Sequence, residues 1–155
     1  MWGEPLNAIS NVAFIVAAVL AFRAIAHIKP TTFIDGYLLC ALLFCIGIGS
    51  FIWHMVPTAS TIMVDVIPIT LFINIYLIAF LRRGFGWHWW QVASGFLALQ
   101  LLNGIAAFLF SPDTLHGTIM YLPTYVMLLG MVLYSQWKQL VFMRALSNIT
   151  LLWTL

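Results

Sequence analysis

The run FIDGYLLCALLFCIGIGSFIWH, residues 33–54, decides the fold of this chain. Asp35 is its only acidic residue, and it contains no lysine or arginine. An α-helix needs about 20 mostly apolar residues to cross the hydrocarbon core of a bilayer. This run has that length and composition, so it predicts a transmembrane helix.

The composition of the whole chain agrees with this interpretation. Of its 155 residues, 64% are hydrophobic and only 6% are charged, whereas about a quarter of the residues in a soluble domain are charged. So few charges do not cover a water-facing surface, and we expect lipid to solvate much of the chain. The formal net charge of +2 is too small to indicate a nucleic-acid partner, and none is expected.

Similar apolar runs lie on both sides of residues 33–54. They cover residues 5–26, 60–81, 89–110 and 117–137, and a sixth begins near residue 144 and reaches residue 155. The connections between them are short, which favours antiparallel neighbours in an up-and-down bundle. The sequence therefore predicts an all-α, polytopic transmembrane bundle of about six helices, in a single domain over residues 1–155.

Basic residues predict how the bundle is oriented. All six fall in or beside the first, third and fifth connections: Arg23, Lys29, Arg82, Arg83, Lys138 and Arg144. The second and fourth connections have none. Because cytoplasmic loops carry an excess of Lys and Arg, we expect these three connections to be cytoplasmic and the N-terminus to lie outside.

Polar side chains within the apolar helices are candidates for function, since they are costly in a membrane. Glu4, Asn7 and Asn11 follow an i, i+3, i+7 spacing, so they share one face of the first predicted helix. The predicted topology places the start of this face at the outer side. Asn74 and Asn103 lie inside helices, where we expect them to form hydrogen bonds across the bundle.

A second polar group is predicted where the second helix turns back into the third. Ser50 and His54 are one turn apart on one face, and Asp65 returns on the next helix. Gly47 and Gly49 precede Ser50 and allow a close helix approach. A histidine can bind zinc, a carboxylate can deprotonate water and a serine hydroxyl can stabilise an oxyanion. Metal-assisted hydrolysis fits this spacing, and so does a hydrogen-bond cluster that only aids packing. A Ser-His-Asp triad is a further option, although Ser50 lacks a nucleophile elbow.

The order and spacing of these residues resemble a known family. The segment EPLNAISN, residues 4–11, matches an E-x-x-N-x-x-S-N element, Ser50 and His54 match S-x-x-x-H, and Asp65 follows eleven residues later. This arrangement resembles the alkaline ceramidases over essentially the whole chain, and its EPLN form resembles their bacterial-type branch. These proteins are seven-helix transmembrane hydrolases, in a superfamily that includes the adiponectin-type receptors.

The resemblance implies a zinc-dependent membrane amidase that hydrolyses the N-acyl bond of a ceramide-like lipid to a sphingoid base and a fatty acid. It implies His54 as a zinc ligand, Asp65 as the base that holds and deprotonates the attacking water, and Ser50 as the hydroxyl that stabilises the oxyanion. The bacterial-type motif implies a bacterial inner membrane, with the site toward the periplasmic leaflet.

The resemblance also implies a calcium site, with Glu4 as a ligand and with Asn7 and Asn11 in the polar network beside it. The family pattern has two further zinc-binding histidines, in an H-x-x-x-H element on its seventh helix, and an acidic stretch before its first helix. Neither is found in these 155 residues. We therefore expect a chain that is truncated at both ends relative to that family and retains six of its seven helices.

Two other functions stay open. A receptor-like or lipid-binding protein of the same architecture needs neither zinc nor a catalytic base. A small transporter is favoured less, because transporters commonly show internal repeats and discontinuous helices near the midplane, and the sequence pattern shows neither. Metal content separates the amidase from the receptor-like protein.

Overall fold

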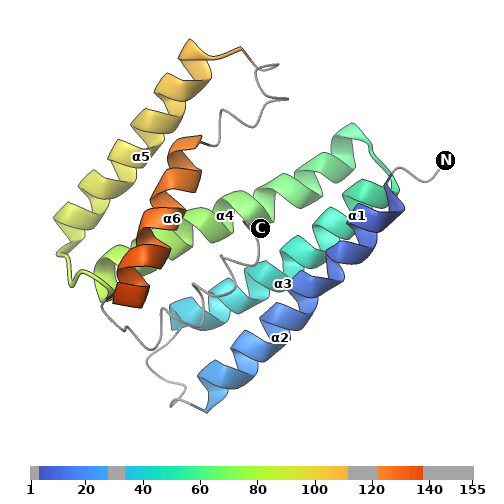
Figure 1. Ribbon diagram of the computed structural model, residues 1–155, viewed down its shortest axis with the longest axis horizontal. Helices are drawn as coiled ribbons and strands as arrows, with labels where there is room; N and C mark the ends of the chain where they lie inside the picture. Colours follow the sequence, from blue (N-terminus) through green and yellow to red (C-terminus); the bar gives the residue numbers. More distant parts are fainter. Residues whose placement is uncertain (1–3, 28–33, 112–121, 138–155) are drawn as a thin grey trace. The chain divides into compact units, whose positions relative to one another are not determined.

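The computed structural model describes residues 4–27, 34–111 and 122–137. Within these ranges every regular element is an α-helix and no strand occurs. Figure 1 shows the helices in chain order: α1 (Pro5–Ser10), α2 (Val12–Ala26), α3 (Ile34–Met55), α4 (Ala59–Arg83), α5 (Trp89–Leu109) and α6 (Leu122–Trp137). The predicted all-α, polytopic fold is confirmed.

Four apolar segments have the length of a membrane span: Pro5–Ala26, which comprises α1 and α2, Ile34–Met55, Ala59–Arg83 and Trp89–Leu109. Each begins and ends within two residues of the corresponding predicted run. Large apolar side chains on these helices are left uncovered, since Phe108 is 88% exposed and Leu6 is 82% exposed. Apolar surface of this kind is stable in lipid and unfavourable in water, so the chain is a multi-pass membrane protein.

The last two predicted runs are only partly described. Helix α6 covers residues 122–137 of the run predicted at 117–137, and the run predicted at 144–155 lies outside the described residues. The apolar part of α6, Leu122–Tyr134, is by itself shorter than a full span. The described residues therefore confirm four spans and the C-terminal part of a fifth helix.

The first span changes its hydrogen-bond pattern at Asn11. The Asn11 N–H is shared between the Asn7 and Ala8 carbonyls, at 3.3 and 3.2 Å, and Asn11 Nδ2 donates to the same Asn7 carbonyl at 2.9 Å. A side chain that bonds to the carbonyl one turn earlier competes with the regular helical bond. The helix still continues, since Asn11 keeps right-handed φ and ψ angles of −66° and −16°.

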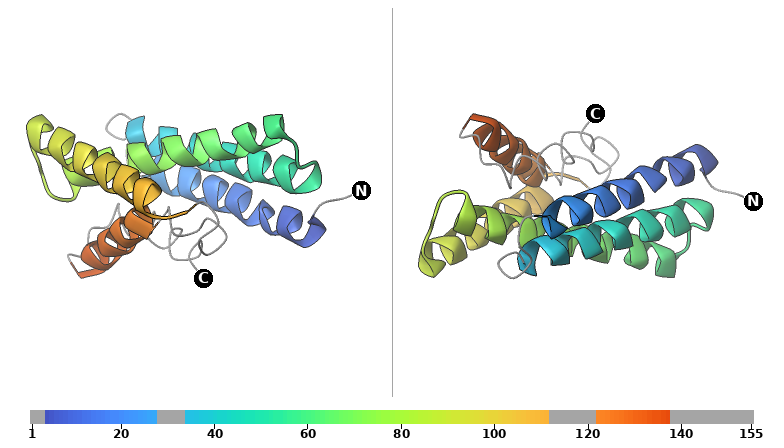
Figure 2. Two further views of the ribbon diagram at one scale, coloured as in Figure 1. Left: turned by 90° about the horizontal axis from the view of Figure 1, so that it is seen from above. Right: turned by 90° about the horizontal axis from the view of Figure 1, so that it is seen from below.

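Residues 1–76 form the first of two compact units. In this unit α1 and α2 lie against α3, as both views of Figure 2 show. The contact depends on Gly47, because a Cβ there would lie 2.6 Å from Ile15 Cγ1 and 3.2 Å from the Asn11 carbonyl oxygen. Small residues let membrane helices approach closely, so Gly47 sets the distance between α2 and α3.

Residues 77–155 form the second unit. Its described part contains α5, α6 and the C-terminal end of α4. The turn between α4 and α5 requires Gly86, whose φ of 66° lies in the left-handed region that favours glycine. Arg82 fixes this turn, because its Nη1 donates to the Trp87 carbonyl and its guanidinium lies 4.8 Å from the centroid of the Trp89 ring. The end of α4 is thereby joined to the start of α5.

The two asparagines predicted to bond across the bundle differ in their partners. Thr124 Oγ1 of α6 donates to Asn103 Oδ1 of α5 at 3.1 Å, which confirms the interhelical bond predicted for Asn103. Asn74 Nδ2 donates to the Thr70 carbonyl at 2.9 Å, within α4. The carbonyl one turn earlier is within reach of an asparagine in a helix, so this bond needs no neighbouring helix.

Candidate functional site

Glu4 and His54 join the start of the first span to the end of α3. The Glu4 N–H donates to the His54 carbonyl at 2.9 Å. The side chains are joined as well, because His54 Nδ1 lies 3.0 Å from Glu4 Oε2. An ionised carboxylate only accepts hydrogen bonds, so a hydrogen bond between these two atoms requires the proton to be on Nδ1. In a neutral ring this leaves Nε2 as the nitrogen with a free lone pair.

Glu4 is also held from its own helix. Asn7 Nδ2 donates to Glu4 Oε2 at 2.6 Å, and Asn11 Nδ2 donates to the Asn7 carbonyl at 2.9 Å. Asn11 is buried, with 6% of its surface exposed, whereas the Glu4 side chain is 62% exposed. The face predicted from the i, i+3, i+7 spacing is therefore a connected set of polar groups, which runs from the helix interface to His54.

Gly49 brings α4 against α3 beside these residues. A Cβ on Gly49 would clash with the Val64 carbonyl oxygen and would lie 3.3 Å from Asp65 Cα. A glycine permits this approach because it has no side chain. Since Asp65 sits at the contact and Ser50 follows Gly49 in α3, this glycine places the carboxylate next to the serine.

Ser50, His54 and Asp65 gather at this contact. Ser50 is 8% exposed, and its hydroxyl and the His54 ring both lie within interaction range of the Asp65 carboxylate. Asp65 Oδ1 is buried and has no hydrogen-bond partner among the described residues. A buried acceptor of this kind calls for a water, an ion or a ligand. The structure thus brings together the three residues that the spacing predicted, and one buried acceptor among them has no partner within the described ranges.

The donors at this contact fit part of a zinc site. His54 is arranged as metal-binding histidines are, with a carboxylate on one ring nitrogen and the other nitrogen available. Asp65 Oδ1 adds a buried oxygen without a hydrogen-bond partner among the described residues, and the Asp65 carboxylate interacts electrostatically with His54. Within the described ranges, no group of three or more His, Cys, Asp or Glu side chains is placed to hold a metal ion. His54 therefore fits as one ligand of such a site.

Glu4 has hydrogen-bond partners that differ from those of a calcium ligand. Its Oε2 accepts a hydrogen bond from Asn7 Nδ2 and lies 3.0 Å from His54 Nδ1, whereas Ca²⁺ takes six to eight oxygen ligands. The Glu4 carboxylate is thus in direct contact with the His54 ring. The calcium site with Glu4, Asn7 and Asn11 stays a prediction.

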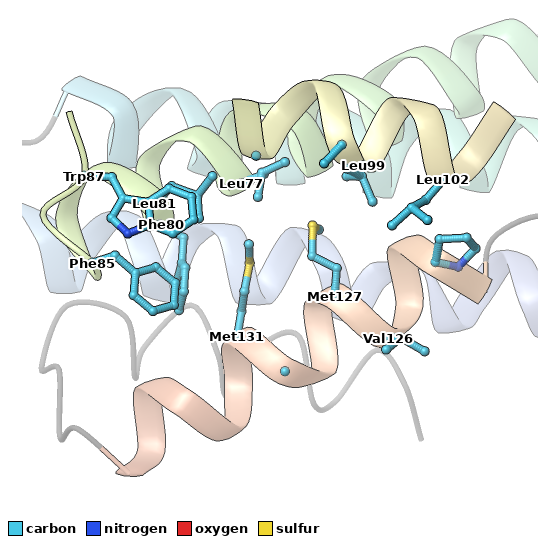
Figure 3. A pocket seen from close by; sticks show the side chains of 14 residues that line it. Leu77, Phe80, Leu81, Phe85, Trp87, Leu99, Leu102, Val126, Met127 and Met131 are labelled. Carbon is cyan, nitrogen blue, oxygen red and sulfur yellow. The ribbon is translucent and has the colours of Figure 1, made fainter. Parts of the chain in front are cut away.

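A separate pocket of about 420 Å³ lies in the second unit, between α4, α5 and α6. Figure 3 shows Met127 and Met131 pointing from α6 toward Leu99 of α5 and Leu77 of α4. None of the described residues that line this pocket is ionisable, so it offers no acid, base or nucleophile. The polar group in the first unit is therefore the candidate for chemistry.

The pairing of Glu4 with His54 is the part of the site that spacing did not predict. Spacing shows which residues share a helix face, whereas these two residues lie on different helices. A signal was nevertheless present, because both lie at the predicted outer ends of their spans. Two polar residues at the same ends of apolar helices are candidates for pairing.

No family model, curated protein or solved structure matches the chain. The alkaline ceramidase family therefore stays a resemblance, which residues 4–11, Ser50, His54 and Asp65 carry.

Proposed function

We propose that the chain is a zinc-dependent membrane amidase, which hydrolyses the N-acyl bond of a ceramide-like lipid to a sphingoid base and a fatty acid. The observation that carries the proposal is the gathering of Ser50 and His54 around Asp65, whose buried Oδ1 has no partner among the described residues. A cluster that only aided packing is expected to satisfy its own buried acceptors. An unsatisfied carboxylate oxygen beside a histidine favours a site that receives a ligand.

The surroundings of the site favour a lipid as the substrate. The site residues lie on spans whose neighbouring side chains present apolar surface, with Phe51 38% exposed and Met63 56% exposed. An amide that carries long hydrocarbon chains is concentrated in the bilayer by the hydrophobic effect. Such a substrate can reach the site from the membrane.

Each side chain has a defined task in this proposal. Asp65 accepts a proton from the water that adds to the acyl carbon, and it delivers this proton to the amine nitrogen as the C–N bond breaks. The water oxygen stays in the fatty acid. Ser50 donates its hydroxyl proton as a hydrogen bond to the carbonyl oxygen, where negative charge develops.

His54 and Glu4 serve the metal in this proposal. His54 Nε2 would bind zinc, while Glu4 keeps the ring in position through Nδ1. Zinc, when bound, supplies Lewis-acid polarisation of the reacting groups.

The distribution of basic residues indicates on which side of the membrane the proposed site opens. All six Lys and Arg residues are predicted on one side of the bundle, and the end of α3 that carries His54 is on the other. By the positive-inside rule the site then opens toward the outer leaflet. For a bacterial inner membrane, this is the periplasmic leaflet.

Zinc content and lipid hydrolysis test the proposal together. Protein in the full length that its gene encodes is purified, its zinc is measured by elemental analysis, and sphingoid base released from an N-acyl sphingosine in mixed micelles is measured by mass spectrometry. We expect about one zinc per chain, which His54→Ala loses and Asp65→Asn keeps. Neither variant should release the sphingoid base, because His54→Ala lacks the zinc ligand and Asp65→Asn lacks the proton acceptor.

His27→Ala and Asp35→Asn are the matched controls, since they remove the same chemical groups outside the site and should keep both zinc and activity. A wild-type protein with neither zinc nor activity would contradict the proposal and favour a receptor-like or lipid-binding protein. Unchanged zinc content in His54→Ala would refute the assignment of His54 as a zinc ligand. Hydrolysis by Asp65→Asn would refute the role of Asp65 as the catalytic base.

A further inference from the structure

A groove of about 480 Å³ lies on the first unit between α2 and α3, toward the end of α3 that is opposite His54. Its walls are mostly apolar, with Val19 on α2 and Ala41 and Phe44 on α3. Its polar residues are Arg23, in the last turn of α2, and Tyr37, in the first turn of α3. The groove therefore has a polar end, and the rest of it is an apolar trough lined by Val19, Ala41 and Phe44.

The length of the groove along α3 is close to the thickness of the hydrocarbon part of one membrane leaflet. Along α3 it extends from Tyr37 to Cys45, which at 1.5 Å per residue is about 12 Å. Half of the hydrocarbon core of a bilayer is about 15 Å thick. The polar end lies where α2 ends and α3 begins, at the surface of the membrane, so the trough runs parallel to the acyl chains of that leaflet.

Arg23 is the charge that the groove offers to a ligand. Its side chain is exposed and forms no hydrogen bond or ion pair with any of the described residues. The adjacent Phe22 packs edge-to-face on Tyr37, with ring centroids 5.3 Å apart. This contact joins α2 to α3 at the polar end of the groove. A guanidinium binds phosphate oxygens in a bidentate manner, and a tyrosine hydroxyl can add a further donor.

We infer that this groove binds an anionic phospholipid from the leaflet on the Arg23 side. The lipid phosphate contacts Arg23, and one acyl chain lies in the trough along Val19, Ala41 and Phe44. An anionic headgroup is favoured over a zwitterionic one because none of the described residues that line the groove is acidic, so these residues offer no partner to a headgroup cation. This lipid site is separate from the proposed amidase, and it stands if that function fails.

Native mass spectrometry of the full chain, titrated with phosphatidylglycerol or with phosphatidylcholine of the same acyl chains, tests the inference. We expect phosphatidylglycerol to bind more tightly than phosphatidylcholine. Arg23→Gln should weaken phosphatidylglycerol binding about fivefold, which corresponds to the roughly 1 kcal/mol that one basic residue contributes near an anionic surface. Ala41→Phe should weaken the binding of both lipids, because it fills the trough.

Two controls make the same chemical changes outside the groove. Arg83→Gln removes a positive charge, and Ala107→Phe adds a ring at an alanine that is exposed, as Ala41 is. Both should leave phosphatidylglycerol binding unchanged. Equal weakening by Arg83→Gln and Arg23→Gln would show general attraction to basic residues and overturn the inference. Unchanged binding in Ala41→Phe would overturn it too, since no acyl chain would then occupy the trough.

Discussion

Substitution of Gly49 by alanine is expected to separate α3 from α4 at the candidate site. The new Cβ would clash with the Val64 carbonyl oxygen and lie 3.0 Å from the carbonyl carbon. These are backbone atoms within a helix, so no rotamer change can relieve the contact and the helices have to move. Overpacking of this kind costs about 1–3 kcal/mol.

Gly104→Ala is the matched control, because a Cβ at that position meets nothing within 4 Å. Both substitutions replace a glycine inside a helix, and both gain the helix propensity of alanine, which is about 1 kcal/mol. This gain cancels when the two variants are compared. Gly49→Ala should therefore be about 1–3 kcal/mol less stable than Gly104→Ala.

Both free energies of unfolding can be measured by SDS titration in mixed micelles, with tryptophan fluorescence as the probe. Hydrolysis should also be lost in Gly49→Ala, because the movement separates Asp65 from Ser50. Equal free energies of unfolding in Gly49→Ala and Gly104→Ala would refute the close approach of α3 and α4. Hydrolysis that survives in a destabilised Gly49→Ala would show that the site does not depend on this contact.

Three further changes test other contacts. Glu4→Gln removes the charge that fixes the His54 ring, so zinc affinity should fall about 10- to 100-fold in a chelator competition; an unchanged affinity would exclude the orienting role. Thr124→Val removes the donor to Asn103 and should lower the free energy of unfolding by about 0.6 kcal/mol, measured by SDS titration, whereas an unchanged value would mean that the bond adds no stability. Val56→Cys, in a background without native cysteines, should react with an impermeant maleimide added outside intact cells. Labelling of this cysteine only after lysis would reverse the predicted orientation.

The membrane spans could be predicted because the thickness of the hydrocarbon core sets the length of each apolar run. This is why the predicted run at 33–54 and the observed Ile34–Met55 differ by one residue at each end. Contacts within one helix could be predicted for a similar reason, since the helical period is constant. The bond from Asn7 to Glu4 and the position of Ser50 one turn before His54 both follow from it.

The sequence alone therefore determined the fold class, four spans and the candidate residues on each helix. Only the tertiary structure decided which of these residues meet. Glu4 pairs with His54 because the start of the first span lies against the end of α3, and Asp65 reaches Ser50 because Gly49 admits the backbone of α4. Contacts between helices depend on crossing geometry and on the approach of two backbones, and the periodicity of a single helix contains neither quantity.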